Sequence, residues 1–216
     1  MESTLNNKTP DLIFSEDLRK RITSNLESHP VITHEEADLR KAAVAIAVAP
    51  QENGQAGFIL TRRSKNLQTH SHQYALPGGK IDLGETREQT VLREVREEIG
   101  IKAEGDSILG YLDDYVTRSG FIITPIVLWI PDLQNMRPEP DEVDEIFIIG
   151  FNELFRPDSP RWVKIPESEN LVLQLPLRNR LIHAPTAAII YQFREIGIQR
   201  NLIRTDEIEE PVWAWR

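Results

Sequence analysis

Three glutamates stand within five residues of one another, where their charges repel. In the stretch Arg93–Glu98, Glu94 and Glu98 would lie one turn apart on the same face of a helix, with Glu97 slightly to the side. Each like-charged pair weakens an isolated helix by roughly a few tenths of a kcal/mol, and the helix C-terminus is the unfavourable end for anions. A hard divalent cation with oxygen ligands would offset that repulsion. The spacing therefore predicts a metal site.

A glycine-rich turn precedes the acidic stretch. Pro77-Gly78-Gly79 lets the backbone approach closely and frees a carbonyl to act as a ligand. Magnesium in such sites keeps several waters and bridges a few carboxylates to substrate phosphates. The combination suits attack of a metal-activated water on phosphorus. The alternative is a solvated helix face rich in Glu and Arg, with the glycines used only for turns.

The elements that must position these residues can be read from local patterns. Thr86–Ile99 contains no Gly or Pro and is followed by Gly100, which predicts a helix. The apolar run 42–49, stopped by Pro50, predicts a buried strand, and 57–61 the returning strand. Further strands are expected at Ile108–Thr117, Phe121–Pro131 and Val143–Ile149, and further helices from Ser15, at Phe151–Phe155 and at Thr186–Ile196. This order predicts an α+β fold with a mixed sheet sandwiched between helices (α/β/α).

Length and composition narrow the class of protein. A chain of 216 residues suits one domain, and we expect an N-terminal extension with a helix over residues 1–40 and a single domain over 41–216. The net charge of −9 argues against nucleic-acid binding, and the lack of cysteine excludes thiolate chemistry. Residues 1–20 lack the apolar core of a signal peptide, and the longest apolar run is too short to span a membrane. A cytoplasmic protein with no membrane partner is expected.

The residues around the glutamates fill every defined position of the Nudix box. The box is Gly, five residues, Glu, seven residues, then Arg-Glu-apolar-any-Glu-Glu-any-Gly-apolar. Its positions are filled here by Gly79, Glu85, Arg93, Glu94, Val95, Glu97, Glu98, Gly100 and Ile101. The chain therefore resembles Nudix hydrolases, which implies the Nudix fold and hydrolysis of a diphosphate linkage in a small-molecule nucleotide with Mg²⁺ or Mn²⁺.

The resemblance also implies roles for individual residues. Glu94 and Glu98 would be the principal metal ligands, Glu97 would join them or hold a metal-bound water, and Gly79 would offer its carbonyl. Arg93 and Glu85 would orient the carboxylates. The general base varies in position within the family. Glu142 is our candidate because it opens a late strand, the alternative being a surface acid in an acidic loop.

The segment before the box reverses the charge of the chain. Between Gln55 and Ile81 there is no Asp or Glu, whereas the segment holds Arg62, Arg63, Lys65, His70, His72 and Lys80. This places positive charge beside the expected metal site, where phosphate groups must settle. We predict that Arg63, together with Arg62 and Lys80, binds substrate phosphate.

The same segment resembles the extra motif of coenzyme A diphosphatases. Leu60–Leu67 leading to Leu76–Gly79 carries the likeness, and 138–149 and 184–189 extend it. It implies cleavage of coenzyme A or acyl-CoA into 3',5'-ADP and phosphopantetheine. His72 and Leu76 stand where that subgroup has Gly and Phe. Because His takes positive φ less freely than Gly, we expect the loop to differ in shape.

Several alternatives stay open. The substrate could be ADP-ribose, a dinucleotide or a modified nucleotide; the chain could be a non-catalytic nucleotide-binding Nudix module; or the acidic helix could bind a partner. Tyr115, Phe121 and Trp129 could stack on an adenine or lie in the core. Trp213 and Trp215 could close the core or a homodimer interface.

Overall fold

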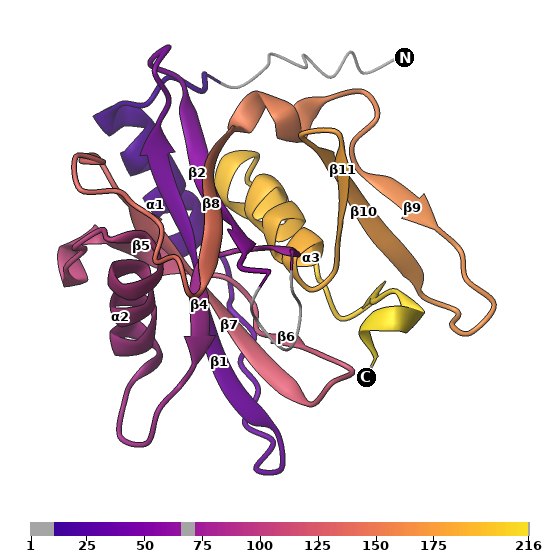
Figure 1. The fold of residues 1–216 in the computed structure, drawn as a ribbon. Helices are drawn as coiled ribbons and strands as arrows, with labels where there is room; N and C mark the ends of the chain where they lie inside the picture. Colours follow the sequence, from indigo (N-terminus) through magenta and orange to yellow (C-terminus); the bar gives the residue numbers. More distant parts are fainter. Residues whose placement is uncertain (1–10, 66–71, 216) are drawn as a thin grey trace, which may run out of the picture.

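A mixed eight-stranded sheet forms the centre of the molecule. The computed structural model describes residues 11–65 and 72–215. The strand order is β3-β2-β1-β7-β5, and β4, β6 and β8 pair with β1, β7 and β2 (Figure 1). The strands are β1 (Arg40–Pro50), β2 (Ala56–Arg63), β3 (Tyr74–Ala75), β4 (Gly78–Lys80), β5 (Ile108–Tyr111), β6 (Tyr115–Val116), β7 (Phe121–Trp129) and β8 (Val143–Gly150). The pair β1–β7 is parallel and the other pairs are antiparallel.

Helices with well-defined caps cover the sheet. The helix α1 (Glu16–Glu27) begins at Ser15, whose hydroxyl accepts a hydrogen bond from Leu18 N. The helix α2 (Arg87–Ile99) begins with a capping box at Thr86 and ends at Gly100, where φ is 71°. The helix α3 (Thr186–Gln192) continues as the π-helix η3 (Phe193–Ile198), so the predicted helix 186–196 changes its hydrogen-bond pattern partway. Single 3-10 turns are η1 (Gly105–Ser107), η2 (Phe151–Phe155) and η4 (Val212–Ala214).

The alternation of side chains along β1 separates two cores. Ala43, Ala45, Ala47 and Ala49 face α2, and their small side chains let the helix pack closely through Val91 and Val95. The intervening Ile46 and Val48 face the opposite side, together with α1 and α3. Figure 1 shows α2 and α3 on opposite sides of the sheet. The predicted α/β/α arrangement is confirmed.

The N-terminal helix is part of this second core. Leu18, Ile22 and Leu26 are buried in the same cluster as Ile189 and Phe193 of the C-terminal helical segment. The division of the chain at residues 40 and 41 remains a prediction. In the part of the chain that is described, no helix is both long enough and apolar enough to cross a membrane.

A second, four-stranded sheet lies beyond α3 and was not predicted. It consists of β9 (Arg161–Val163), β10 (Leu171–Leu177), β11 (Arg180–His183) and β12 (Ile208–Glu209). Its strands are short, and Pro176 lies inside β10, which weakens a sequence-based strand prediction. The second core shared with α1 and α3 extends into this sheet through Leu173, Leu175 and Ile182.

Candidate functional site

Three carboxylates from two parts of the chain meet at the edge of the central sheet. Glu94 and Glu98 project from α2, and Glu142 lies in the turn before β8. Each offers an oxygen within 4.8 Å of the others. Glu98 is buried, Glu94 is half-buried and Glu142 is exposed. The group thus spans from the protein interior to solvent.

Burial makes the negative charge of this group costly. The pKa of Glu98 is raised to about 8, first by burial and then by the charge of Glu94. Burial also raises the pKa of Glu94, against the lowering effect of Arg93. Gly78 N donates to Glu98 Oε2 at 3.1 Å. A cation among these oxygens would remove the electrostatic cost.

Gly78 and Gly79, at the start of the box, let strand and helix approach each other. A Cβ at Gly79 would lie 2.1 Å from Glu94 Oε1, so the carboxylate occupies the space that a side chain would take. At Gly78, where φ is 153°, a Cβ would lie 2.3 Å from Ala43 O. Both positions therefore require glycine. A ligand role for the Gly79 carbonyl stays a prediction.

Arg93 connects the carboxylates of the box. Its Nε and Nη2 donate to Glu85 at 2.8 and 3.1 Å, and its Nη1 donates to Glu94 at 2.9 Å. Arg93 lowers the pKa of Glu85 to about 2, with a further hydrogen bond from Thr90. Arg93 and Glu85 thus fix the position of Glu94; that they orient a metal ligand stays a prediction.

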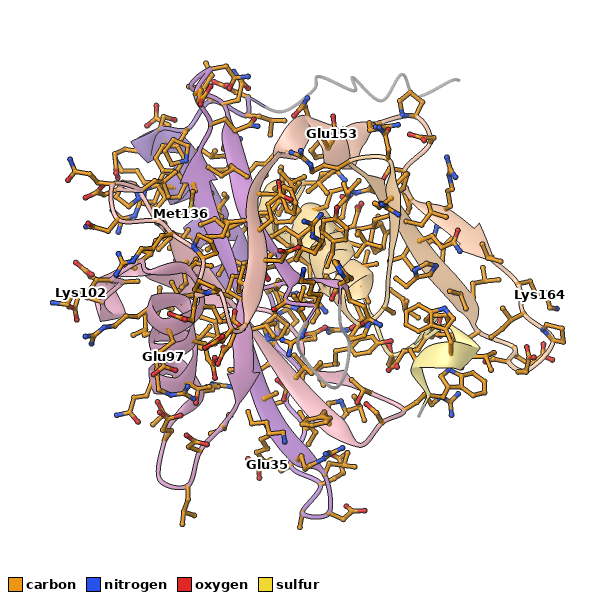
Figure 2. The ribbon with its side chains drawn as sticks, in the orientation of Figure 1. Glu35, Glu97, Lys102, Met136, Glu153 and Lys164 are labelled. Carbon is orange, nitrogen blue, oxygen red and sulfur yellow. The ribbon has the colours of Figure 1, made fainter. Side chains whose placement is uncertain are left out.

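Glu97 stands apart from the carboxylate group. Its side chain is exposed on α2 (Figure 2), and its Oε2 accepts a hydrogen bond from Arg93 Nη1 at 3.0 Å. Among the described residues, the group whose oxygens lie within 4.8 Å contains Glu94, Glu98 and Glu142 but not Glu97. The structure therefore does not bring Glu97 together with the other predicted metal ligands. Because Glu97 lies three residues after Glu94, its side chain turns toward Arg93 instead.

A cleft of about 1170 Å³ adjoins Gly78 and Gly79. Arg62, Arg63 and Lys80, the predicted phosphate-binding residues, all line it. They differ in their partners, however. Arg62 donates from Nε to Asp144 at 2.9 Å and also pairs with Glu145 at 3.0 Å.

Arg63 has unused hydrogen-bonding capacity at the cleft. Its buried Nε has no hydrogen-bond partner in the described part of the chain. Its charge lowers the pKa of Glu98, against the larger raising effects of burial and Glu94. Arg63 is therefore the better placed of the two arginines to meet an incoming anion.

The backbone at His72, in the described part of the segment before the box, has a positive φ, which histidine adopts less freely than glycine. His72 has a φ of 59°, in the left-handed region, and lines the cleft. That the loop differs in shape from that of the subgroup stays a prediction. His70 lies outside the described residues. Tyr115 and Trp129 are buried in the core, whereas Phe121 lines the cleft beneath Arg40, whose guanidinium carbon is 3.8 Å from the ring centre.

The far wall of the cleft comes from residues that were not among the predicted site residues. It includes Asn179–Thr186, around β11 and the start of α3, and Glu210 and Trp213 near the C-terminus. In the sequence, Glu209-Glu210-Pro211 resembles a surface acidic run. The pairing of β12 with β10 and the hydrogen bonds from Arg118 hold it at the cleft.

Comparisons with known proteins agree with this geometry. The NUDIX domain model matches residues 39–168. Nudix hydrolase 3 of Caenorhabditis elegans is 35% identical over 151 residues, covering 66% of this chain and 63% of that protein. The uncharacterized Nudix hydrolase NudL of Salmonella heidelberg (strain SL476) is 37% identical over 119 residues, covering 55% of this chain and 61% of that protein. The chain thus spans less than two thirds of the length of these curated relatives.

A solved structure shares the fold. The MutT/nudix family protein from Enterococcus faecalis superimposes with a TM-score of 0.54 at 16% sequence identity. The match covers 74% of this chain and 62% of that protein. At this identity, the likeness concerns the fold alone.

Proposed function

Because the chain belongs to the NUDIX domain family, we propose that it is a metal-dependent hydrolase that cleaves the diphosphate linkage of a nucleoside diphosphate derivative. One observation carries the proposal. Glu94, Glu98 and Glu142 converge beside Gly78-Gly79, at a cleft lined by basic side chains. Carboxylates to hold a cation and arginines to hold phosphate are the two requirements of such a reaction.

The chemistry of the three carboxylates fits Mg²⁺ or Mn²⁺. All donors are oxygens, which these hard cations prefer. Glu98, buried next to Glu94, would hold the ion from the protein side, and the exposed Glu142 from the solvent side. When bound, the ion would lower the pKa of an attacking water and neutralise phosphate charge.

The side chains of the protein perform the remaining tasks. Besides holding the ion, Glu142, the exposed member of the group, would accept a proton from water. The guanidinium of Arg63, which lines the cleft, donates to a phosphate oxygen. Arg93 holds Glu94 in place through its hydrogen bonds, with Glu85 as its counter-charge.

The substrate that we propose is coenzyme A or an acyl-CoA. Two of the segments that resemble coenzyme A diphosphatases contribute to the cleft, through Arg62-Arg63 and through Ala184-Pro185-Thr186. The cleft volume of about 1170 Å³ exceeds the roughly 300–1000 Å³ of ordinary small-molecule pockets. Such a cleft suits an extended substrate with a diphosphate in its middle.

Product analysis tests this assignment. The protein is incubated with coenzyme A, ADP-ribose and a nucleoside triphosphate, each with Mg²⁺, with Mn²⁺ and with EDTA. We expect 3',5'-ADP and phosphopantetheine from coenzyme A, at the highest kcat/KM of the panel, and no products in EDTA. Faster cleavage of ADP-ribose would refute the coenzyme A assignment. No cleavage of any substrate with either metal would refute the hydrolase itself.

The variant Glu98→Gln is the matched control for these reactions. It keeps the size of the side chain and an oxygen that can accept the hydrogen bond from Gly78 N. It removes the charge of the buried ligand. Products that form equally fast with this variant would come from a contaminating enzyme.

A further inference from the structure

The part of the chain beyond the matched domain builds one wall of the cleft. The domain model ends at residue 168, whereas β11, the start of α3 and the segment around η4 all line the cleft that contains Gly78 and Gly79. Arg118 N, in the turn between β6 and β7, donates to Glu210 Oε1 at 3.0 Å and fixes this wall against the central sheet. A ligand bound between the walls would therefore contact residues beyond the matched domain.

Trp213 presents an aromatic surface on this wall. The residue is 58% exposed although tryptophan is a large apolar side chain. The ring of His183 meets it edge to face, with ring centres 5.6 Å apart and planes at 83°. The side-chain amide nitrogen of Gln174 lies 3.1 Å from His183 Nε2 and holds that ring in turn. A supported, exposed indole in a cleft is a stacking surface for a planar ligand.

Glu210 adds an acceptor that the protein does not use. Only 2% of its surface is exposed, yet it lines the cleft. One carboxylate oxygen accepts the hydrogen bond from Arg118 N, and no donor meets the other oxygen among the residues that the structure describes. Its backbone is fixed, because Trp215 Nε1 donates to its carbonyl at 2.9 Å. The second oxygen is not fully enclosed, so a ligand in the cleft could supply an N–H or O–H to it.

The adjacent Glu209 provides a comparison, because protein side chains pair with its carboxylate. Glu209 accepts from Arg118 Nε at 3.1 Å and from Ser168 Oγ at 2.7 Å. Arg118 holds its pKa at about 2. Burial instead raises the pKa of Glu210 to about 7, and the charge of Glu209 adds to this, against the lowering effect of Arg118. The two adjacent glutamates therefore have different environments, and only Glu210 lines the cleft.

From these contacts we infer that Trp213 and Glu210 form a nucleobase subsite, in which the indole stacks on the base and the carboxylate accepts a hydrogen bond from an exocyclic amino group. The inference rests on the proposed function for the position of the phosphates. Glu210 repels anions, so the diphosphate lies toward Arg63 and Lys80, and the base lies at the opposite wall. A base with an amino group, such as adenine, fits the acceptor, and a base with a carbonyl at the same position does not.

Calorimetric binding in EDTA tests the subsite without relying on catalysis. The ligands are AMP, IMP and ribose 5-phosphate, which share a phosphate and a ribose but differ in the base. At pH 8, above the pKa of about 7, Glu210 is ionised and can only accept. We expect AMP to bind at least about 10-fold more tightly than ribose 5-phosphate, since stacking contributes roughly 1–3 kcal/mol per base. We expect AMP to bind at least about 5-fold more tightly than IMP.

Single-residue variants test which side chain causes each binding preference. Trp213→Ala is expected to abolish the preference of AMP over ribose 5-phosphate, and Trp213→Phe to restore part of it. Trp162→Ala is the control, because that indole is 43% exposed on β9 and does not line the cleft. Glu210→Gln is expected to reduce the preference of AMP over IMP to within about 2-fold. The exposed Glu207→Gln makes the same charge change outside the cleft.

The outcomes separate this inference from the proposed function. Equal binding of AMP and ribose 5-phosphate to the unaltered protein would overturn the subsite, as would a base preference that survives in Trp213→Ala. If the protein prefers AMP but cleaves no diphosphate with either metal, the subsite stands and the hydrolase fails. If coenzyme A is cleaved and Trp213→Ala leaves its KM unchanged, the hydrolase stands and the subsite fails.

Discussion

Replacing Glu98 by Gln should make the metal-free protein more stable while it destroys activity. In the absence of a cation, Glu98 is a buried carboxyl beside Glu94, with a single backbone donor from Gly78. Gln at this position is neutral and keeps an acceptor for that donor. The variant thus loses a metal ligand and no longer has a buried carboxyl that must take up a proton on folding.

The size of the effect follows from the pKa of Glu98. Folding raises this pKa from 4.5 to about 8, so the folded state binds the proton more tightly. The stability associated with the protonated carboxyl is fully present below pH 4.5 and is lost as the pH rises toward 8. At neutral pH the loss amounts to about 3 kcal/mol, from about 1.4 kcal/mol per pH unit. Glu98→Gln should therefore unfold like the unaltered protein near pH 4.5 and be more stable by up to about 3 kcal/mol at pH 7.

Urea denaturation in EDTA at the two pH values measures this difference. Glu97→Gln is the matched control, because Glu97 is exposed and outside the carboxylate group, and its stability should change by less than about 1 kcal/mol. Adding Mg²⁺ should then stabilise the unaltered protein and not Glu98→Gln. The reasoning is refuted if Glu98→Gln is the less stable protein at pH 7 in EDTA, or if Mg²⁺ stabilises both equally.

Three further perturbations probe the phosphate contacts, the glycine turn and the C-terminal wall. Arg63→Ala should lower kcat/KM by about 10- to 100-fold, since a hydrogen bond to a charged group contributes roughly 1.5–3 kcal/mol. Steady-state kinetics should show a smaller loss for Arg62→Ala, whose guanidinium is already paired with acidic side chains; equal losses would contradict the assignment. Gly79→Ala should cost about 100-fold in kcat, because the new Cβ would lie 2.1 Å from the nearest carboxylate oxygen and displace it. Thermal melting should show that the fold is retained, and full activity would be evidence against the metal site. Glu210→Gln should gain stability relative to the unaltered protein as the pH rises from 4.5 to about 7, by up to about 2 kcal/mol after solvent screening, because burial raises this pKa. Denaturation curves that differ by the same amount at every pH would show that Glu210 does not titrate in this way.

Local patterns were sufficient to predict the box and its helix. The capping residue Thr86 and the left-handed Gly100 bound α2 as the sequence predicts. The i, i+4 spacing places Glu94 and Glu98 on one face, because helix geometry depends only on neighbours along the chain. Local patterns likewise predicted a buried strand over 42–49, which lies within β1.

The tertiary structure decided which other residues join them. The register of β2 with β8 pairs Arg63 with Val143, and Ser64 N donates to Glu142 O at 2.8 Å, so Glu142 arrives beside the box glutamates. No local pattern encodes such a register.

The sequence also did not predict the hydrogen-bond and ion-pair partners of individual side chains. Arg62 and Arg63 are adjacent and chemically identical, yet one is neutralised by acids on β8 and the other has a buried Nε without a partner in the described chain. The wall formed by Glu210 and Trp213 depends on β12 pairing with β10. Spacing along the chain determined the helix that carries the glutamates, because its hydrogen bonds are local. The third carboxylate and the walls of the cleft depended on contacts between distant segments, which exist only once the sheets have formed.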